Sequence, residues 1–137
     1  MSDPVTQFAD AIRAAADAKR PLNIRGGGSK TFYGNPSTGE VLDIRGYSGI
    51  IEYEPTELVI TARAGTPLAD IEAAMREQGQ MLGFEPPHFG GNATIGGCIA
   101  AGLSGPRRPY AGSARDFVLG LRLLDGRGSD LHFGGQV

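Results

Sequence analysis

The sequence contains no tryptophan, a single cysteine and no long uninterrupted apolar run. One cysteine excludes an intrachain disulfide framework and any metal site built from several cysteines. No other residue set predicts a metal site. An apolar run long enough to cross a bilayer is missing, and so is the layout of a secretory signal peptide. These absences predict a cytoplasmic protein.

The sequence also has no large excess of charge of one sign, because 13 basic and 15 acidic residues give a net charge of −2. The basic residues do not form a stripe interleaved with aromatic residues, and the pair Arg107-Arg108 is too short to attract a polyanion. A nucleic-acid partner is therefore not predicted. The 137 residues, 40% of them hydrophobic, are enough for one folded domain with its own core.

Glycine, in contrast, is abundant, with 22 residues that gather in two places. Residues 90–102 contain five glycines, and Gly26-Gly27-Gly28 forms a separate cluster directly after an apolar run. Glycine is favoured where the backbone takes a positive φ or where a ligand approaches it closely. We interpret residues 90–102 as a loop opening onto a short helix, with free N–H groups available to an anion. Two such loops suit a dinucleotide, and a flavin dinucleotide is the working hypothesis.

The remaining pattern mixes helices and strands. Apolar spacing predicts one helix that begins at Asp3-Pro4 and ends before Pro21, and a second that runs from Thr66-Pro67 to Gly79. Their predicted inner faces carry Val5, Phe8, Ala9, Ile12, Ala15 and Ala16 in the first, and Leu68, Ile71 and Met75 in the second. Strands are expected at residues 22–25, 41–44, 50–54, 58–64 and 117–124, with a hairpin turn at Asp125-Gly126 and a returning strand through Leu131 and Phe133. Residues 106–113 read as irregular.

Two common nucleotide motifs fail on spacing. A Walker loop needs glycine directly before lysine, whereas Ser29 separates Gly28 from Lys30. A nicotinamide-type dinucleotide fold needs Gly-x-Gly-x-x-Gly between a strand and a helix, and neither glycine cluster has that spacing. A structural turn at the first cluster and tight packing at the second stay open as plainer interpretations.

A different family matches the order of the motifs. The chain resembles the FAD-linked oxidases of the vanillyl-alcohol-oxidase type, also called PCMH-type FAD-binding domains. The likeness is greatest to the smaller FAD-binding subunit of bacterial glycolate oxidases. It rests on Arg25-Gly26-Gly27-Gly28-Ser29, Thr94-Ile95-Gly96-Gly97-Cys98-Ile99-Ala100-Ala101-Gly102, Tyr110-Ala111-Gly112, Asp116-Phe117-Val118-Leu119-Gly120 and Asp125-Gly126.

This resemblance implies an α+β fold with two subdomains, residues 1–80 and the beginning of a mainly antiparallel unit over 81–137. It implies that the FAD module continues past Val137 and that a substrate-covering domain follows. The present stretch would then be a C-terminally truncated module and inactive alone. The implied cofactor-binding residues are Arg25, Gly26, Gly27, Gly28, Ser29, Thr94, Ile95, Gly96, Gly97, Ala101, Gly102, Tyr110 and Gly112.

Two departures from the family pattern matter. Relatives with covalently attached flavin often carry histidine where Ser29 stands, so we expect non-covalent FAD. Relatives also often have asparagine at the positions of Cys98 and Gly102, so some of the usual polar contacts are not expected here. No residue of this chain is identified as a catalytic acid or base.

The implied function is oxidation of a 2-hydroxy acid, glycolate in particular. Hydride would pass to the flavin, and electrons would leave through partner subunits, including an iron–sulfur subunit. The complex would be cytoplasmic or peripheral at the inner membrane. Two alternatives remain: a non-catalytic subunit that stabilises such a complex, and a UDP-sugar-reductase-like flavoenzyme with the same FAD module.

Several single residues have both a functional and a plain interpretation. Cys98 is expected to be a small buried residue rather than a nucleophile. His88 could approach a flavin or be an ordinary loop histidine, whereas His132 is expected to point to solvent. Phosphate pairing or plain solvation is open for Lys30 and Arg107, and Tyr110 could touch the flavin or brace its loop.

Overall fold

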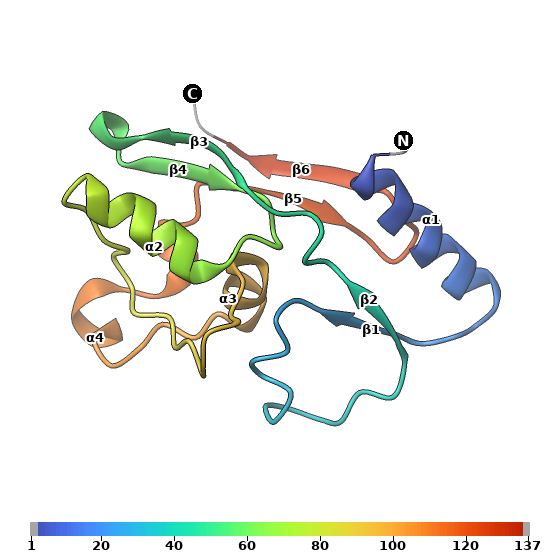
Figure 1. The fold of residues 1–137 in the computed structure, drawn as a ribbon. Coiled ribbons are helices and arrows are strands. Elements are labelled where there is room, and N and C mark those ends of the chain that lie inside the picture. The colour runs from blue at the N-terminus through green and yellow to red at the C-terminus, as the bar shows by residue number, and fades with distance from the viewer. Residues whose placement is uncertain (1–2, 136–137) are drawn as a thin grey trace.

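The computed structural model describes residues 3–135, which form a mixture of helices and short strands (Figure 1). The helices are α1 (Pro4–Asp17), α2 (Leu68–Glu77), α3 (Ile95–Ala101) and α4 (Arg108–Ala111), with two 3-10 turns, η1 (Pro55–Glu57) and η2 (Ala114–Phe117). The strands are β1 (Leu22–Arg25), β2 (Glu40–Asp43), β3 (Ile50–Glu54), β4 (Val59–Ala62), β5 (Gly120–Leu124) and β6 (Asp130–Gly134). Within residues 3–135, no helix combines the length and the apolar character that a bilayer crossing requires.

The strands pair two by two. β1 and β2 run parallel, with Leu22 opposite Glu40 and Arg25 opposite Asp43. β3–β4 and β5–β6 are antiparallel hairpins, the first with a register irregularity near Ile50. In Figure 1 the two hairpins run along the upper side of the molecule, while α2, α3 and α4 lie below them. The parallel pair β1–β2 needs a long connection, and residues 26–39 provide it as an extended loop.

Helix α1 lies against the β5–β6 hairpin, where the Arg13 guanidinium donates a 2.9 Å hydrogen bond to the carbonyl of Gly128. Val5, Ala9 and Ala15 are its buried residues, as the spacing predicts. The prediction was wrong for Ala16, which is exposed, because the inner face of the helix is narrower than the apolar pattern. Asp3 precedes the helix, but its side chain makes no capping hydrogen bond.

Helix α2 supplies the most deeply buried side chains, Leu68 and Ile71, with Met75 one turn further on. It ends as predicted at a glycine: Gly79 has φ +67° and donates to Arg76, and Gln80 donates to Met75. This is the hydrogen-bond pattern of a Schellman helix end. A second buried cluster contains Phe84, Ala114 and Cys98, the buried residue of α3.

Three predictions of local structure were wrong. The strand expected over 117–124 begins only at Gly120, because residues 114–117 form the 3-10 turn η2. Ser113 and Asp116 cap that turn reciprocally, so local hydrogen bonds outweigh the apolar run that follows. Residues 108–111 were expected to be irregular but form the short helix α4. Pro109 lies in the first turn of this helix, where proline is favoured. The fourth strand is also shorter than predicted, starting at Val59 because Leu58 takes a left-handed φ of +57°.

One bridge joins the two halves of the chain and positions the glycine segment. Pro67 pairs antiparallel with Thr94, so Leu68 donates to Ala93 at 2.8 Å and Ile95 donates to Thr66 at 2.9 Å. Thr66 is buried and its hydroxyl bonds to the backbone of Gly49 and Arg63. The start of α3 is therefore fixed to the chain that precedes α2. The division at residue 80 stays a prediction.

Candidate cofactor-binding site

The first glycine loop begins where β1 ends. The carbonyl of Arg25 accepts a 3.0 Å hydrogen bond from Ile44, which is the last contact of the parallel pair before the chain turns away. Gly28 then takes a φ of +70°, a conformation that side chains with a Cβ rarely adopt. Within residues 3–135, the backbone N–H groups of residues 26–29 donate no hydrogen bond to the protein. Four backbone donors in a row are thus left for a ligand or for water.

The first loop packs directly on the second glycine segment. A Cβ placed on Gly27 would lie 1.5 Å from the carbonyl oxygen of Asn92, and one on Gly26 would lie 2.5 Å from the Thr94 hydroxyl. Both positions therefore require glycine, since backbone and a buried threonine occupy the space of a side chain. The two glycine clusters, far apart in the sequence, form one continuous surface.

The N-terminus of α3 does not offer the free donors that the sequence predicts. Its first N–H groups all have partners in the protein: Ile95 donates to Thr66, Gly96 to Ala64 at 2.8 Å, and Cys98 to Thr94 at 2.9 Å. The N–H of Gly97 donates to the Thr94 hydroxyl at 3.2 Å, the N-cap bond of this helix. The expectation of free donors at this helix start was wrong, because backbone carbonyls at residues 64 and 66 and the Thr94 hydroxyl and carbonyl accept from them. Cofactor binding by these residues stays a prediction.

The unpaired donors of the second segment lie earlier, before the helix. Gly90, Gly91 and Asn92 are exposed, and within the described residues their N–H groups have no partner in the chain. Gly90 has φ +106°, and a Cβ on either glycine would meet no atom within 4 Å. The candidate anion site is therefore formed by residues 26–29 and 90–92, which meet at the contact of Gly27 with Asn92.

Gly96 and Gly97 lie inside α3 and differ in their surroundings. A Cβ on Gly96 would lie 2.8 Å from both the methyl carbon and the carbonyl oxygen of Ala64, so this glycine lets α3 approach the strand end closely. A Cβ on Gly97 would lie 3.3 Å from the Thr94 hydroxyl and 3.9 Å from the Lys30 ammonium. Tight packing, the plainer interpretation of the second cluster, thus accounts for Gly96.

Other predicted site residues lie at the far end of α3. Ala101 is the last residue of the helix, and Gly102 ends it with φ +66° and an N–H donated to Cys98 at 3.0 Å. Gly112 ends α4 with φ +101°, and the Tyr110 side chain is 95% exposed. Figure 1 shows α4 apart from the first glycine loop, so the structure does not bring these residues together with the loops.

The side chains around the two loops are of mixed character. The His88 ring and the Glu72 carboxylate lie 2.9 Å apart, and so form an ion pair when the histidine is protonated. Burial raises the pKa of the Cys98 thiol to about 11, which leaves it protonated and unreactive at neutral pH, as predicted. Phe32 and Phe89 meet edge to face with ring centroids 5.0 Å apart, and so join the chain that follows the first glycine loop to the residue that precedes Gly90. Sequence reasoning missed Asn92, whose backbone contact with Gly27 is visible only in three dimensions.

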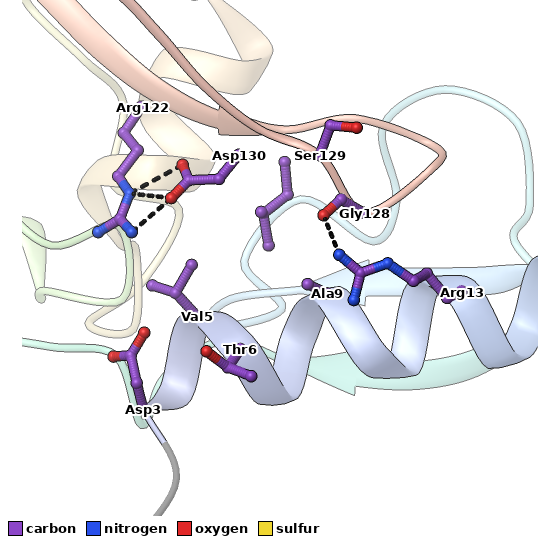
Figure 2. Close-up of a pocket in the computed structure, with 10 residues that line it drawn as sticks. Asp3, Val5, Thr6, Ala9, Arg13, Arg122, Gly128, Ser129 and Asp130 are labelled. Atoms are coloured by element: carbon purple, nitrogen blue, oxygen red, sulfur yellow. Dashed lines mark hydrogen bonds and ion pairs between the residues drawn. The ribbon is translucent and has the colours of Figure 1, made fainter.

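Two hollows lie elsewhere on the surface. One of them, of about 230 Å³, lies between α1 and the β5–β6 hairpin, where Nε and Nη2 of Arg122 donate hydrogen bonds to the Asp130 carboxylate (Figure 2). Arg122 and Asp130 form an ion pair within it, and the glycine loops do not line it. The other, of about 410 Å³, lies between Gly102, α4 and β5. Neither contains residues 26–29 or 90–92.

A family comparison identifies residues 4–134 as a match to the FAD binding domain model. Among curated relatives, the glycolate oxidase subunit GlcE of Escherichia coli is 58% identical over 92% of this chain and 36% of its own length. A D-lactate dehydrogenase of Archaeoglobus fulgidus is 31% identical over 92% of this chain and 28% of its own. The D-2-hydroxyglutarate dehydrogenase of Xanthomonas citri is 32% identical over 64% of this chain and 18% of its own. The chain therefore spans about a third or less of the length of these relatives.

Solved structures share the fold at lower identity. The grass pollen allergen Phl p 4, a glucose dehydrogenase, superposes with a TM-score of 0.74 over 97% of this chain and 28% of its own, at 16% identity. The 6-hydroxy-D-nicotine oxidase of Arthrobacter nicotinovorans gives 0.69 over 92% of this chain and 27% of its own, at 22% identity. These likenesses support the predicted α+β, PCMH-type fold and carry no information on substrate.

Proposed function

Because the chain belongs to the family of FAD binding domains, we propose that the whole protein is the FAD-binding subunit of a flavin-dependent 2-hydroxy-acid oxidoreductase. Glycolate is the proposed substrate, supported by 58% identity to a glycolate oxidase subunit. Two further relatives are named as dehydrogenases of other 2-hydroxy acids, D-lactate and D-2-hydroxyglutarate. FAD itself is the cofactor of this domain.

One observation carries the placement of the cofactor: residues 26–29 and 90–92 meet, and both present unpaired backbone N–H groups. Backbone donors suit a diphosphate because several can converge on its oxygens without the entropy cost of ordering long side chains. Glycine at 26 and 27 allows the two loops to touch, and open space at Gly90 and Gly91 allows a ligand to approach the backbone. We place the FAD diphosphate at this contact.

Bound FAD supplies a two-electron acceptor for oxidation of the substrate carbon. The residues of this chain bind and orient the cofactor and limit the access of water to it. The Cys98 thiol takes no part, because burial keeps it protonated. Ser29 stands where covalent flavoproteins of this kind often have histidine, so the cofactor is proposed to be held without a covalent bond.

The remaining assignments concern the whole complex. Electrons are proposed to leave the flavin through partner subunits, one of them an iron–sulfur protein. The proposed location is the cytoplasm, with peripheral attachment to the inner membrane through the complex. Support for a multi-subunit enzyme comes from the relative's own designation as an oxidase subunit.

A non-catalytic role is the second candidate. The His88 side chain favours this role. His88 is the histidine closest in sequence to the glycine segment, and its ring is hydrogen-bonded to the Glu72 carboxylate at 2.9 Å. A subunit with an engaged histidine and a protonated thiol could hold FAD for structure while the chemistry occurs on another chain.

The experiment is an absorbance spectrum of the purified full-length protein before and after acid precipitation. Flavin bands that move to the supernatant support non-covalent FAD, and reduction of a dye by glycolate then supports the oxidoreductase. D-lactate and D-2-hydroxyglutarate serve as comparison substrates. A flavin-loaded protein that reduces no dye with any of the three acids, alone or with its partner subunits, would favour the structural role. A protein that neither contains nor takes up FAD would overturn the proposal.

A further inference from the structure

Lys30 lies where the two glycine segments face each other. It directly follows Ser29, and its ammonium nitrogen lies 3.9 Å from the point that a Cβ on Gly97 would occupy. The side chain therefore extends from the first loop toward the start of α3. Its charge also acts on the buried Cys98 thiol, whose pKa it lowers against the larger effect of burial. The geometry thus places this ammonium group beside the start of α3.

No acidic side chain neutralises Lys30. Among residues 3–135, the lysine is half-buried and takes part in no ion pair. Glu72, which also acts electrostatically on Cys98, is engaged by His88. In contrast, Arg13, Arg20, Arg45, Arg107, Arg122 and Arg127 each lie within ion-pair distance of a carboxylate.

The groups around Lys30 add to its positive potential. The unpaired N–H groups of residues 26–29 carry partial positive charge, and they immediately precede the lysine. A half-buried cation beside unpaired donors is electrostatically unfavourable until an anion arrives. The arrangement is therefore complementary to a ligand with at least one full negative charge, and two adjacent phosphates meet that requirement.

We propose that Lys30 is the cation that pairs with the diphosphate of the bound flavin dinucleotide and makes the site prefer FAD to uncharged riboflavin. This inference rests on the proposed function, since it takes the ligand to be FAD. A lysine suits the position because its ammonium is a compact point charge that can contact oxygens of either phosphate. The glycine loops then set where the diphosphate lies, and Lys30 sets how strongly its charge is favoured.

The first test compares variants of the apo full-length protein in titrations with FAD and with riboflavin. Lys30→Gln should weaken FAD binding about ten- to hundredfold, the range expected for loss of one charge-assisted hydrogen bond. Riboflavin affinity should change by no more than about twofold, because riboflavin has no phosphate. Lys30→Arg, which keeps the charge, should recover most of the affinity. Lys19→Gln is the matched control, because Lys19 is exposed and is the other lysine of the sequence.

The second measurement does not depend on a variant that folds. Lys30 and Lys19 can be acetylated in the unaltered protein, and mass spectrometry then gives the modified fraction of each. FAD should protect Lys30 and leave Lys19 unchanged, whereas riboflavin should protect neither. Equal FAD affinity in Lys30→Gln and unaltered protein, or acetylation of Lys30 that FAD does not slow, would overturn the inference. If the unaltered protein binds no FAD, the proposed function fails instead, so the two failures are distinguishable.

Discussion

The two glycine-rich segments use the same residue for different physical purposes. In the first, Gly26 and Gly27 are pressed against Asn92 and Thr94, while the N–H groups of the loop stay unpaired. In the second, the N–H groups of residues 95–98 are bonded within the protein, whereas among residues 3–135 those of the exposed residues 90–92 have no partner. Glycine density thus marks close approach of the backbone in both segments, but available donors occur throughout the first loop and in only part of the second segment.

This difference assigns separate roles along the second segment. Residues 90–92 belong to the candidate anion site, Gly96 belongs to the packing of α3 on Ala64, and Gly102 belongs to the end of the helix. A substitution at each place should therefore affect cofactor binding and stability in different proportions.

Replacing Gly27 with valine should have the largest effect. Its Cβ would overlap the carbonyl oxygen of Asn92, so the two loops would have to separate. We expect loss of FAD binding together with a destabilisation of at least about 1–3 kcal/mol, the usual cost of overpacking. Denaturant unfolding and FAD titration of the same variant measure both quantities. A variant as stable as the unaltered protein, with intact FAD affinity, would show that the loops do not meet here.

Alanine at Gly96 and at Gly97 forms a matched pair within one turn of α3. A Cβ at 96 would lie 2.8 Å from the Ala64 carbonyl oxygen, so Gly96→Ala should cost about 1–3 kcal/mol. At 97, the better helix propensity of alanine should offset crowding of the Thr94 hydroxyl, leaving stability within about 1 kcal/mol of the original. Denaturant unfolding of both variants tests the contrast, and equal costs at the two positions would contradict it.

Thr94 should matter for the helix and, through it, for the loop contact. Thr94→Ala removes the hydroxyl that accepts from Gly97 at 3.2 Å and should cost about 0.5–2 kcal/mol, as loss of an N-cap does. Thr94→Ser keeps the acceptor and should retain most of that stability. Thermal unfolding of the two variants gives the comparison. A serine variant as unstable as the alanine variant would mean that the methyl group, rather than the cap, stabilises this site.

Gly102→Ala should have the smallest effect on FAD binding. Nothing lies within 4 Å of the added Cβ, but φ +66° is unfavourable for alanine, so a cost of about 1–2 kcal/mol is expected. FAD affinity should change by no more than about twofold, because the residue lies at the far end of α3 from the loops. A loss of FAD affinity without a loss of stability would place Gly102 in the binding site, as the family resemblance implies.

Much of this fold follows from local patterns. The run before Gly26 forms a strand that ends at the glycine loop, Gly79 ends α2, and Asp125 begins the turn between β5 and β6. Each depends on residues close in sequence, so periodicity and turn chemistry are sufficient. Ser113 and Asp116 were one local exception, since their reciprocal capping replaced the first part of a predicted strand.

The site was less predictable because its geometry is non-local. The sequence indicates a helix after Thr94, but not that carbonyls at Ala64 and Thr66 would use the N–H groups at its start. That outcome depends on the bridge between Pro67 and Thr94. The contact of Gly27 with Asn92 and the position of Lys30 opposite Gly97 depend in the same way on how distant segments meet. Residue type thus located the two loops, and tertiary packing decided which of their donors are unpaired.

The most direct test of the candidate site is amide hydrogen exchange in the full-length protein, measured by mass spectrometry with and without FAD. Without FAD, residues 26–29 and 90–92 should exchange quickly and residues 95–98 slowly, because only the latter are bonded within the protein. FAD should slow exchange in the two loops and change residues 95–98 little. Slow exchange of the loops before FAD is added, or FAD protection confined to residues 95–98, would contradict the account.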